Sequence, residues 1–406
     1  MIHPKMLYTY VGVDSHKDTH TAVFLDCFFE KLGELQFENL PSKFEEFFDE
    51  ALKLEAEGTT LFFGLEDTSA YGRNLTAFIL EKGYSVKHVN AFLVSRERKN
   101  RNITVKSDAV DAECAARVLL SKLDDLPDAK PDDLHWMLRT LVVRRDFLVK
   151  NNGALKNCLH NLLTQHYPNY RSFFENIDCN ASLAFFLRFP SPAALEGTSL
   201  EELAAILAEP SGGKFGEEKA QTIMDSIQDT AADRQEIRDM TVRSTVRQLR
   251  FNLEELENME EALAQILALF NCTLTSMKGL DTISAAQLLS CIGDVRKFPT
   301  PAKLARYAGI APATFSSGKK ETQYASKRGN RELNSIFYGL SVRLTMTAGS
   351  KKRVVNPFFF DYYHKKLADG KTKAQALKCV QRRLVNIVWS MLTNGEEYVN
   401  PPTYNV

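Results

Sequence analysis

The stretch LYTYVGVDSHKDTHTAVFLD, residues 7–26, decides the fold of the first part of the chain. Apolar and polar or small residues alternate through LYTYVGVD (7–14) and again through TAVFLD (21–26). The polar run SHKDTH (15–20) between them has the composition of a turn. A period of two is typical of half-buried strands, so the stretch predicts two strands joined as a hairpin.

The residues after this hairpin switch between two patterns of apolar spacing. One pattern is that of a helix with a buried face, and the other is the short apolar run of a buried strand. A hairpin followed by strands that alternate with helices indicates a mixed α/β sheet, the arrangement of ribonuclease-H-like domains among others. In chain order the sequence predicts a helix in 42–58, a strand in TTLFFGLE (59–66), a helix through NLTAFILEKG (74–83), a strand in YSVKHVN (84–90), an irregular basic stretch after Val94, and a helix over 107–119.

Acidic side chains stand at the ends of several of these predicted elements. Asp14 ends the first strand and Glu66 ends a later one. Asp108 and Asp111 are three residues apart and therefore share one face of the predicted helix. Because strand ends project side chains into the crevice above a sheet, the sequence predicts that these carboxylates meet at one point.

Each of these acids also has a purely structural explanation. Asp14 fits the start of a turn, and Asp67 fits the role assigned to Glu66. Asp108 fits a helix cap beside Ser107. Taken together, however, clustered negative charges repel strongly and persist only with a cation between them. The pattern therefore predicts a site for Mg²⁺ or Mn²⁺ of the kind that supports phosphodiester cleavage.

Basic and histidine residues lie next to the acids in the sequence. Lys106, two residues before Asp108, fits either a contact to a bound phosphate or a solvated side chain at a helix start. His16, Lys17 and His20 fit either DNA contacts or the shaping of the hairpin. Their spacing does not support a zinc site.

The middle of the chain, residues 131–273, is predicted to be entirely helical. An insertion at 168–235, which contains several prolines and the loop SGGKFG, separates two apolar rows with a seven-residue spacing. This spacing is typical of a coiled coil or a long helical hairpin, formed within one subunit or between two. The rows are Leu141, Leu148, Leu155 and Leu162, then Val242, Leu249, Leu256, Leu263 and Phe270.

The last part, residues 274–406, is predicted to be mainly helical apart from one polar loop, ATFSSGKKETQYASKRGNREL (313–333). A serine hydroxyl needs a base, a metal or cationic neighbours to act as a nucleophile at neutral pH. Positive charges also stabilise a pentavalent phosphate. By themselves these residues fit either an ordinary Ser-Gly turn on a basic surface or a phosphate-binding loop, in which the candidate nucleic-acid contacts are Lys319, Lys320, Lys327 and Arg328.

The order of these motifs resembles the DEDD transposases of bacterial insertion sequences. These have a RuvC-like N-terminal domain and a separate transposase domain with a catalytic serine. The resemblance covers nearly the full chain. It is carried by YVGVDSHKDTHTAVF (10–24), GLEDTSAYG (64–72), VKSDAVDAECAARVL (105–119), the segment from GLDTIS to NRELN (279–334) and the segment from NPFFF to VNIVW (356–389).

The resemblance implies a catalytic site with two parts. The nucleophile of the family falls on Ser317, with the adjacent Ser316 as the alternative, and it forms a covalent phosphoserine link to DNA. The predicted domains are a RuvC-like domain (1–130), a helical coiled-coil region (131–273) and a transposase domain (274–406). The metal-binding tetrad of the family falls on Asp14, Glu66, Asp108 and Asp111.

The resemblance also implies a function and partners. The function is a recombinase that cuts and rejoins the DNA of an insertion sequence. The partners are donor and target DNA, a structured bridge RNA that guides the enzyme, and further subunits in a dimer or tetramer. Two other functions fit the residues, namely a junction-specific nuclease that uses only carboxylates and water, and a nucleic-acid scaffold. A sugar-kinase function would need a second glycine-rich phosphate motif, which the sequence lacks.

Composition indicates a globular, cytoplasmic protein of two or three domains. The chain has 406 residues, 44% hydrophobic and 25% charged, and its seven cysteines are scattered singly. It has no apolar run of about 20 residues and no export signal. Lys+Arg and Asp+Glu number 51 each, but residues 351–387 carry ten basic against two acidic side chains. That stretch fits a phosphate-facing surface or a solvated helix face.

Overall fold

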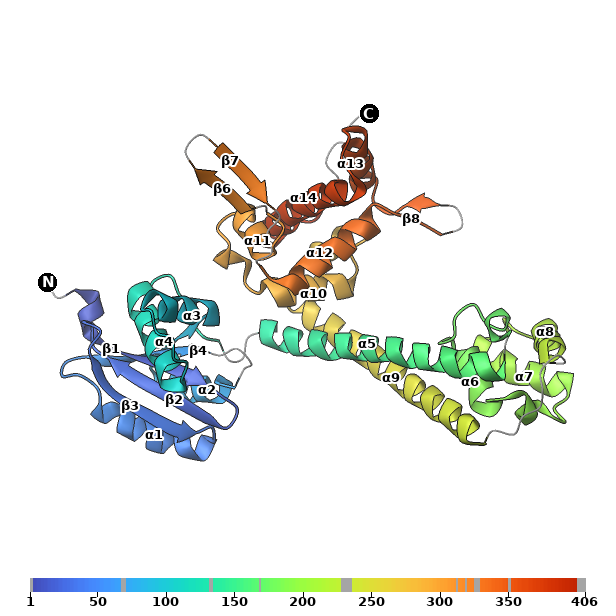
Figure 1. Ribbon diagram of the computed structural model, residues 1–406, viewed down its shortest axis with the longest axis horizontal. Coiled ribbons are helices and arrows are strands. Elements are labelled where there is room, and N and C mark those ends of the chain that lie inside the picture. The colour runs from blue at the N-terminus through green and yellow to red at the C-terminus, as the bar shows by residue number, and fades with distance from the viewer. Residues whose placement is uncertain are drawn as a thin grey trace. The chain divides into compact units, whose positions relative to one another are not determined.

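The computed structural model describes residues 3–66, 71–130, 134–167, 169–227, 236–311, 313–317, 320–324, 329–349 and 352–399. The chain divides into two compact units, Met1–Asp133 and Leu134–Val406 (Figure 1). The first is a mixed α/β sheet with helices and the second is mostly helical, which confirms the predicted fold class at this level. All seven cysteines are free thiols. Among the described helices, none has the length and apolarity needed to span a membrane.

The N-terminal sheet has the strand order β3-β2-β1-β4-β5. Strand β1 pairs antiparallel with β2 and parallel with β4, as expected for a hairpin followed by a crossover. The elements of this unit are β1 (Tyr8–Ser15), β2 (Thr19–Leu25), β3 (Lys31–Glu38), α1 (Pro41–Lys53), β4 (Thr60–Glu66), α2 (Arg73–Glu81), β5 (Ser85–Val89), α3 (Ala91–Asn100) and α4 (Asp108–Lys122).

Two elements of this unit differ from the sequence prediction. Strand β3 was not predicted, because it is an edge strand without a buried residue and carries charged side chains. The basic stretch after Val94 was predicted to be irregular, but its first half, residues 95–100, belongs to helix α3, and only residues 101–106 lack regular structure. Asn90 caps that helix by accepting a hydrogen bond from the Phe92 amide at 2.8 Å. Because only Val94 is buried, the helix has no apolar stripe that periodicity could detect.

Side chains alternate between the two faces of the central strand. Val11 and Val13 enter a core shared with α1 and α2. Tyr10 enters the opposite core, under α4. The period of two therefore places Asp14 on the same face as Tyr10, the face that α4 covers.

Gly12 allows α4 to pack directly on β1. A Cβ atom at Gly12 would lie 2.1 Å from the Ala112 carbonyl oxygen and 2.2 Å from the Ala116 nitrogen, both backbone atoms of α4. No rotamer change relieves a backbone clash, so Gly12→Ala is expected to destabilise the N-terminal unit by about 3 kcal/mol. Calorimetry, together with hydrogen exchange of the α4 amides, measures this effect.

Gly153→Ala is the matched control for this substitution. Gly153 lies within helix α5 and a Cβ there meets nothing within 4 Å. Because alanine favours helix over glycine, this variant is expected to gain about 0.5–1 kcal/mol. Equal stability of Gly12→Ala and the unsubstituted chain would show that α4 does not pack on β1 in this way.

The second unit begins with two long helices that pack against each other, α5 (Leu134–His166) and α9 (Glu236–Ala268). Arg145, near the start of α5, pairs with Glu260, near the end of α9, at 2.8 Å, so the helices run antiparallel. Leu148 and Leu249 from the two predicted apolar rows are buried within this single chain. Between α5 and α9 in the chain lies a helical insertion with α6 (Asn180–Arg188), α7 (Leu200–Ser211) and α8 (Glu217–Ile227). Its apolar residues share one buried cluster with Leu159 of α5 and Val242 of α9.

The C-terminal helices share a core with the base of the α5–α9 pair. Leu138 of α5 and Leu263 of α9 lie in the same buried cluster as Phe337 and Leu384. The polar loop predicted around the serines proved to be partly a β-hairpin. The elements are α10 (Thr282–Ile292), α11 (Pro301–Tyr307), β6 (Ala313–Ser317), β7 (Lys320–Tyr324), α12 (Arg331–Leu344), β8 (Thr347–Ala348), β9 (Arg353–Val354), α13 (Pro357–Ala368) and α14 (Lys373–Asn394).

Candidate active site

Two of the predicted acids end neighbouring parallel strands. Asp14 of β1 and Glu66 of β4 are direct register partners. Asp14 lies two residues after Gly12, and Glu66 lies two residues after Gly64, so each acid is on the same face of the sheet as that glycine. The glycines have no side chains, which leaves room for α4. The strand register thus places Asp14 and Glu66 side by side on the face that α4 covers. Asp67, the alternative to Glu66, lies outside the described residues.

The other two predicted acids lie in the first turns of α4. Ser107 is the N-cap residue, and its Oγ accepts a hydrogen bond from the Val110 amide at 3.3 Å. The capping role therefore belongs to Ser107 and not to Asp108, which leaves the Asp108 carboxylate available. Asp111 is 5% exposed and pairs with the Arg98 guanidinium of α3. A negative charge in the first turn of a helix is stabilised by the helix dipole.

His16 joins this cluster, although the sequence predicted it only as a DNA contact or a turn residue. Its Nε2 lies 3.2 Å from Asp14 Oδ2 and 3.3 Å from Asp108 Oδ1. One ligand atom from each of these residues lies within 4.8 Å of the others, as in a metal-binding group. Asn39 fixes the turn by donating hydrogen bonds to the carbonyls of His16 and Lys17.

The pKa of Asp14 reflects this crowding. Burial raises its pKa above the usual value, and His16 opposes that shift. The carboxylates of Asp108 and Asp111 raise the pKa further. The acids from β1 and α4 therefore act on one another electrostatically, as the sequence predicted for converging carboxylates.

Glu66 shows the same effect more strongly. Burial raises its pKa to about 7, and the charges of Asp14 and Asp111 add to the shift. The nearby charges of Lys106 and Arg98 act in the opposite direction. Lys106 is itself exposed, so its ammonium group is open to solvent or to a phosphate.

The cluster fits a divalent cation with oxygen ligands. Glu66 Oε2 is buried and has no hydrogen-bond partner among the described residues, which is costly unless a cation is bound. Carboxylate oxygens are the ligands that Mg²⁺ and Mn²⁺ prefer. The residues that would hold such ions are Asp14, Glu66, Asp108 and Asp111, with His16 as an additional nitrogen donor.

Metal affinity is expected to rise steeply with pH because of Glu66. A ligand must be deprotonated to bind, and the pKa of Glu66 is about 7. Mn²⁺ affinity should therefore increase by up to about tenfold per pH unit below pH 7 and level off above it. Titration of Mn²⁺ followed by its paramagnetic resonance signal measures this dependence.

In the metal-free chain, the stability of the fold changes with pH in the opposite direction to the metal affinity. The folded pKa of Glu66 is raised above its unfolded value, so the metal-free unit loses stability as pH rises through about 7. Glu66→Gln removes the titrating group, so both the Mn²⁺ affinity and the stability of the metal-free unit should depend less on pH. An Mn²⁺ affinity that is independent of pH in the unsubstituted chain would exclude Glu66 as a ligand.

The candidate serines lie in the β6–β7 hairpin of the second unit. In the backbone register Ser316 pairs with Glu321, and Ser317 pairs with Lys320, the last pair before the turn. The candidate contacts Lys319, Lys327 and Arg328 lie outside the described residues.

Close backbone packing holds the two ends of the hairpin segment together. Gly329 has a positive φ of 119°, and a Cβ there would lie 2.5 Å from the Gly309 nitrogen. The Asn330 amide donates to the Tyr307 carbonyl at 2.7 Å. The Asn330 side chain caps α12 through the Leu333 amide.

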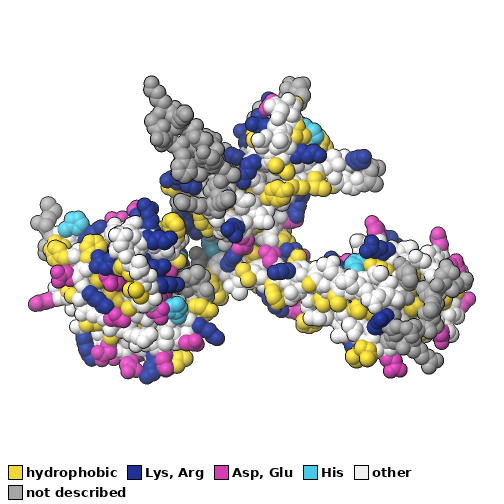
Figure 2. Space-filling view, in the orientation of Figure 1, with side chains coloured by type: hydrophobic (Ala, Val, Ile, Leu, Met, Phe, Trp, Pro, Cys, Tyr) yellow, Lys and Arg dark blue, Asp and Glu magenta, His cyan; other side chains and the backbone are white. Residues whose placement is uncertain are grey.

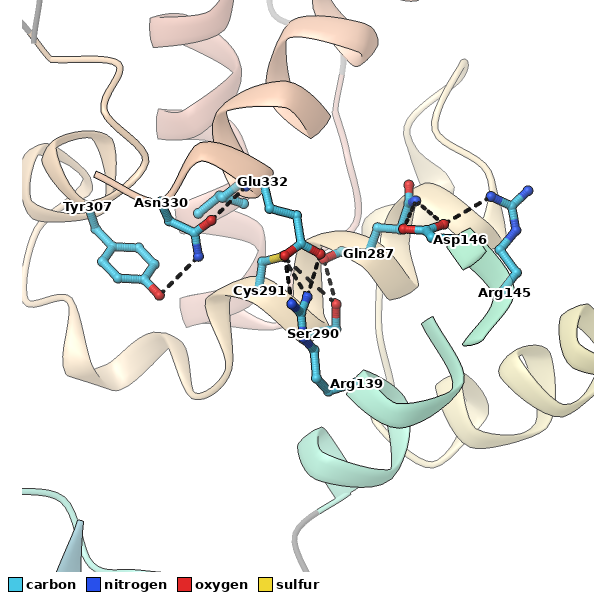
Figure 3. A network of polar contacts seen from close by, with 10 residues as sticks. Arg139, Arg145, Asp146, Gln287, Ser290, Cys291, Tyr307, Asn330 and Glu332 are labelled. Carbon is cyan, nitrogen blue, oxygen red and sulfur yellow. Dashed lines mark hydrogen bonds and ion pairs between the residues drawn. The ribbon is translucent and has the colours of Figure 1, made fainter. Parts of the chain in front are cut away.

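A polar network fastens α12, just after the hairpin, to α5 and α10. Arg139 of α5 makes a two-point ion pair with Glu332 of α12, at 2.5 and 2.6 Å (Figure 3). Gln287 of α10 donates to Asp146 of α5 at 3.0 Å. Paired charge-assisted hydrogen bonds of this kind fix orientation as well as distance. These contacts connect the helix that follows the hairpin to α5 and α10.

Three basic side chains of the stretch 351–387 have partners within the second unit. Arg382 donates to the Pro301 carbonyl, Arg383 lies over the Phe358 ring and Lys366 pairs with Asp369. Several of its charges are therefore used within the unit. On the N-terminal unit, Figure 2 shows basic and acidic side chains intermixed over the visible face.

Comparison with known proteins agrees with this arrangement. A DEDD transposase model of the IS110 type matches residues 11–168, and a model described as transposase IS116/IS110/IS902 family matches residues 271–354. The insertion element IS110 protein of Streptomyces coelicolor is 30% identical over 403 residues, which cover 96% of this chain and 95% of the relative. The insertion element IS116 protein of Streptomyces clavuligerus is 26% identical over 407 residues, 97% of this chain and 96% of the relative.

A more distant relative matches over a shorter region. The pilin gene-inverting protein of Moraxella bovis is 27% identical over 145 residues, 33% of this chain and 43% of the relative. The DEDD-type domain implies DNA cleavage and joining and the use of a divalent metal. The chain belongs to the IS116/IS110/IS902 family of transposases.

Proposed function

We propose that this chain cuts and rejoins insertion-sequence DNA with a divalent-metal tetrad and a serine nucleophile. The tetrad is Asp14, Glu66, Asp108 and Asp111, and the nucleophile is Ser317. The observation that carries the proposal is the placement of Asp14 beside Glu66 under the start of α4, with Glu66 Oε2 buried and unpaired among the described residues. A buried carboxylate without a partner is expected where a cation binds.

The proposed chemistry is a transesterification. The Ser317 Oγ forms a bond to a DNA phosphorus while one of the two phosphorus–oxygen bonds to deoxyribose breaks. The serine proton leaves to a base or water, and the departing deoxyribose oxygen gains a proton. Bound Mg²⁺ would supply Lewis acidity toward the phosphate oxygens. Rejoining reverses these steps on a second DNA end.

The protein residues have distinct tasks in this reaction. Asp14 and Asp111, which are almost fully buried, would fix the position of the cation. Lys106 is exposed near Glu66 and would contact the phosphate backbone. Lys319, Lys320, Lys327 and Arg328 would contact nucleic acid around the serine.

The proposal includes partners and assembly. A structured bridge RNA would choose the DNA target by base pairing, as the family resemblance implies. The chain would act in the cytoplasm as a dimer or tetramer, with serine and tetrad contributed by different subunits. Exposed apolar residues on the long helices, among them Phe147 and Phe251, would support a coiled-coil contact between subunits.

A junction-specific nuclease is the second candidate function. It would use the same carboxylates with water as the nucleophile, and Ser317 would only contact phosphate. The unpaired Glu66 oxygen fits both functions. The family membership favours the transposase, because joining of DNA ends is the step that a nuclease lacks.

The products of the reaction distinguish the two functions. The chain is incubated with Mg²⁺, its copurifying RNA and labelled DNA that carries an element end. We expect strands joined to new partners and a transient protein–DNA adduct that resists denaturation. Free ends without joined strands or adduct would support the nuclease and contradict the proposal.

A further inference from the structure

A cavity in the helical insertion is separate from the tetrad and the serine hairpin. Its volume is about 360 Å³, within the usual range for small-ligand pockets. It lies between α5, the turn Tyr170–Ser172 and α6. Tyr170, Phe174 and Phe186 supply aromatic lining. Such walls favour a flat ligand that can stack or insert between rings.

The same cavity contains unsatisfied polar groups. Ser182 is fully buried, and its Oγ lacks a hydrogen-bond partner in the part of the chain that the structure describes. His160 Nδ1 lies 2.7 Å from the Tyr170 hydroxyl, and the Arg171 Nε donates to that hydroxyl at 3.3 Å. Both contacts hold the Tyr170 hydroxyl in place at the cavity wall.

The charges lining the cavity are of both signs. Arg171 provides a guanidinium, which only donates hydrogen bonds, and Glu175 provides a carboxylate, which only accepts them. Burial, together with the charges of Arg171 and Lys156, lowers the pKa of His160, so that its imidazole stays neutral at neutral pH. A ligand that uses both charges must therefore carry hydrogen-bond donors as well as acceptors.

These features exclude several ligand classes. A free phosphate would meet the Glu175 carboxylate and three aromatic rings. A purely apolar ligand would leave the Ser182 hydroxyl and both charges unmatched. A metal ion would find only Glu175 and His160 as good ligands, which is too few for a stable site.

We propose that this cavity binds one unpaired nucleobase, with guanine preferred. A guanine presents two adjacent N–H donors on one edge, which match Glu175, and two acceptors on another edge, which match Arg171. Proteins that read single-stranded nucleic acid combine stacking on aromatic rings with hydrogen bonds to base edges in this way. The inference rests on the proposed function only in that the chain handles nucleic acid.

The test measures binding of short labelled oligonucleotides to the full chain by fluorescence anisotropy. The probes are oligouridylates of about ten nucleotides with a central guanine, a central adenine or a central abasic site, and the matching oligothymidylates in DNA. The unsubstituted chain is expected to prefer the guanine probe by about tenfold over the abasic one. The RNA and DNA series show which nucleic acid supplies the base.

Glu175→Gln and Arg171→Met change exposed side chains at the mouth of the cavity. Each is expected to abolish the preference for guanine. Glu209→Gln and Lys214→Met change exposed residues of the same insertion that do not line the cavity, and these matched controls should keep the preference for guanine. The proposal would be overturned if the unsubstituted chain bound all probes equally. It would also be overturned if the two control variants lost the preference for guanine while the two cavity variants kept it.

A second measurement does not depend on the variants. A central 6-thioguanosine probe is photocrosslinked to the unsubstituted chain, and the crosslinked peptide is expected within residues 160–186. A crosslink outside this segment would contradict the assignment. Neither test requires strand cleavage. Guanine binding without DNA joining would contradict the proposed function and support this inference. DNA joining without guanine binding would support the proposed function and contradict this inference.

Discussion

Replacing Asp14 with asparagine is expected to lower the rate of DNA cleavage by at least about 100-fold, because even residues that only support metal ligands contribute about 10–100-fold. Asp14 is 7% exposed, is the register partner of Glu66 and touches His16. Its loss removes a central oxygen ligand. Gel assays of strand cleavage and of DNA binding measure the two effects separately, and binding should be unchanged.

Stability is expected to separate a catalytic role of Asp14 from a structural one. Burial and neighbouring carboxylates raise the pKa of Asp14, so the fold disfavours its charge in the absence of metal. Asp14→Asn should therefore melt at the same temperature as the unsubstituted metal-free chain or higher. Asp18→Asn, an exposed position in the same turn, is the matched control and should cleave normally. Normal cleavage by Asp14→Asn would contradict the tetrad.

Ser317→Ala is expected to abolish the covalent protein–DNA adduct and the joining of strands. Alanine removes the only atom that could form the phosphoserine bond and leaves the tetrad untouched. Ser317 ends β6 in register with Lys320, and alanine is compatible with that backbone. Denaturing gels of protein crosslinked to labelled DNA measure the adduct, and Mn²⁺ affinity should be unchanged.

Ser316→Ala is the control for this substitution. Ser316 directly precedes Ser317 in β6 and pairs with Glu321 in the backbone register. Ser316→Ala should retain most of the adduct. If Ser316→Ala alone abolishes it, the nucleophile is Ser316, and if neither variant affects it, no serine of the hairpin is the nucleophile.

The sheet and its acids could be predicted from sequence because both depend on local periodicity. Alternation in LYTYVGVD predicted β1, and the apolar run before Glu66 predicted β4. Because β1 and β4 are parallel neighbours in the sheet, the acids at their ends, Asp14 and Glu66, lie side by side. Ser107 and Asp108 similarly matched the start of a helix.

Features that depend on tertiary packing could not be predicted in this way. His16 lies in a turn, where no periodicity fixes the direction of a side chain, and its contact with Asp108 joins residues far apart in the chain. The partner of Asp111, Arg98, lies on a helix whose basic sequence appeared irregular. Short polar strands such as β6 and β7 resemble loops, because their backbone pairing needs no apolar side chains.

Anomalous scattering from the chain crystallised with Mn²⁺ tests the metal site most directly. The prediction is one or two peaks about 2.1 Å from carboxylate oxygens of the tetrad, Glu66 included. A peak held by other residues, or none near Asp14 and Glu66 at saturating Mn²⁺, would show that these acids do not form a metal site.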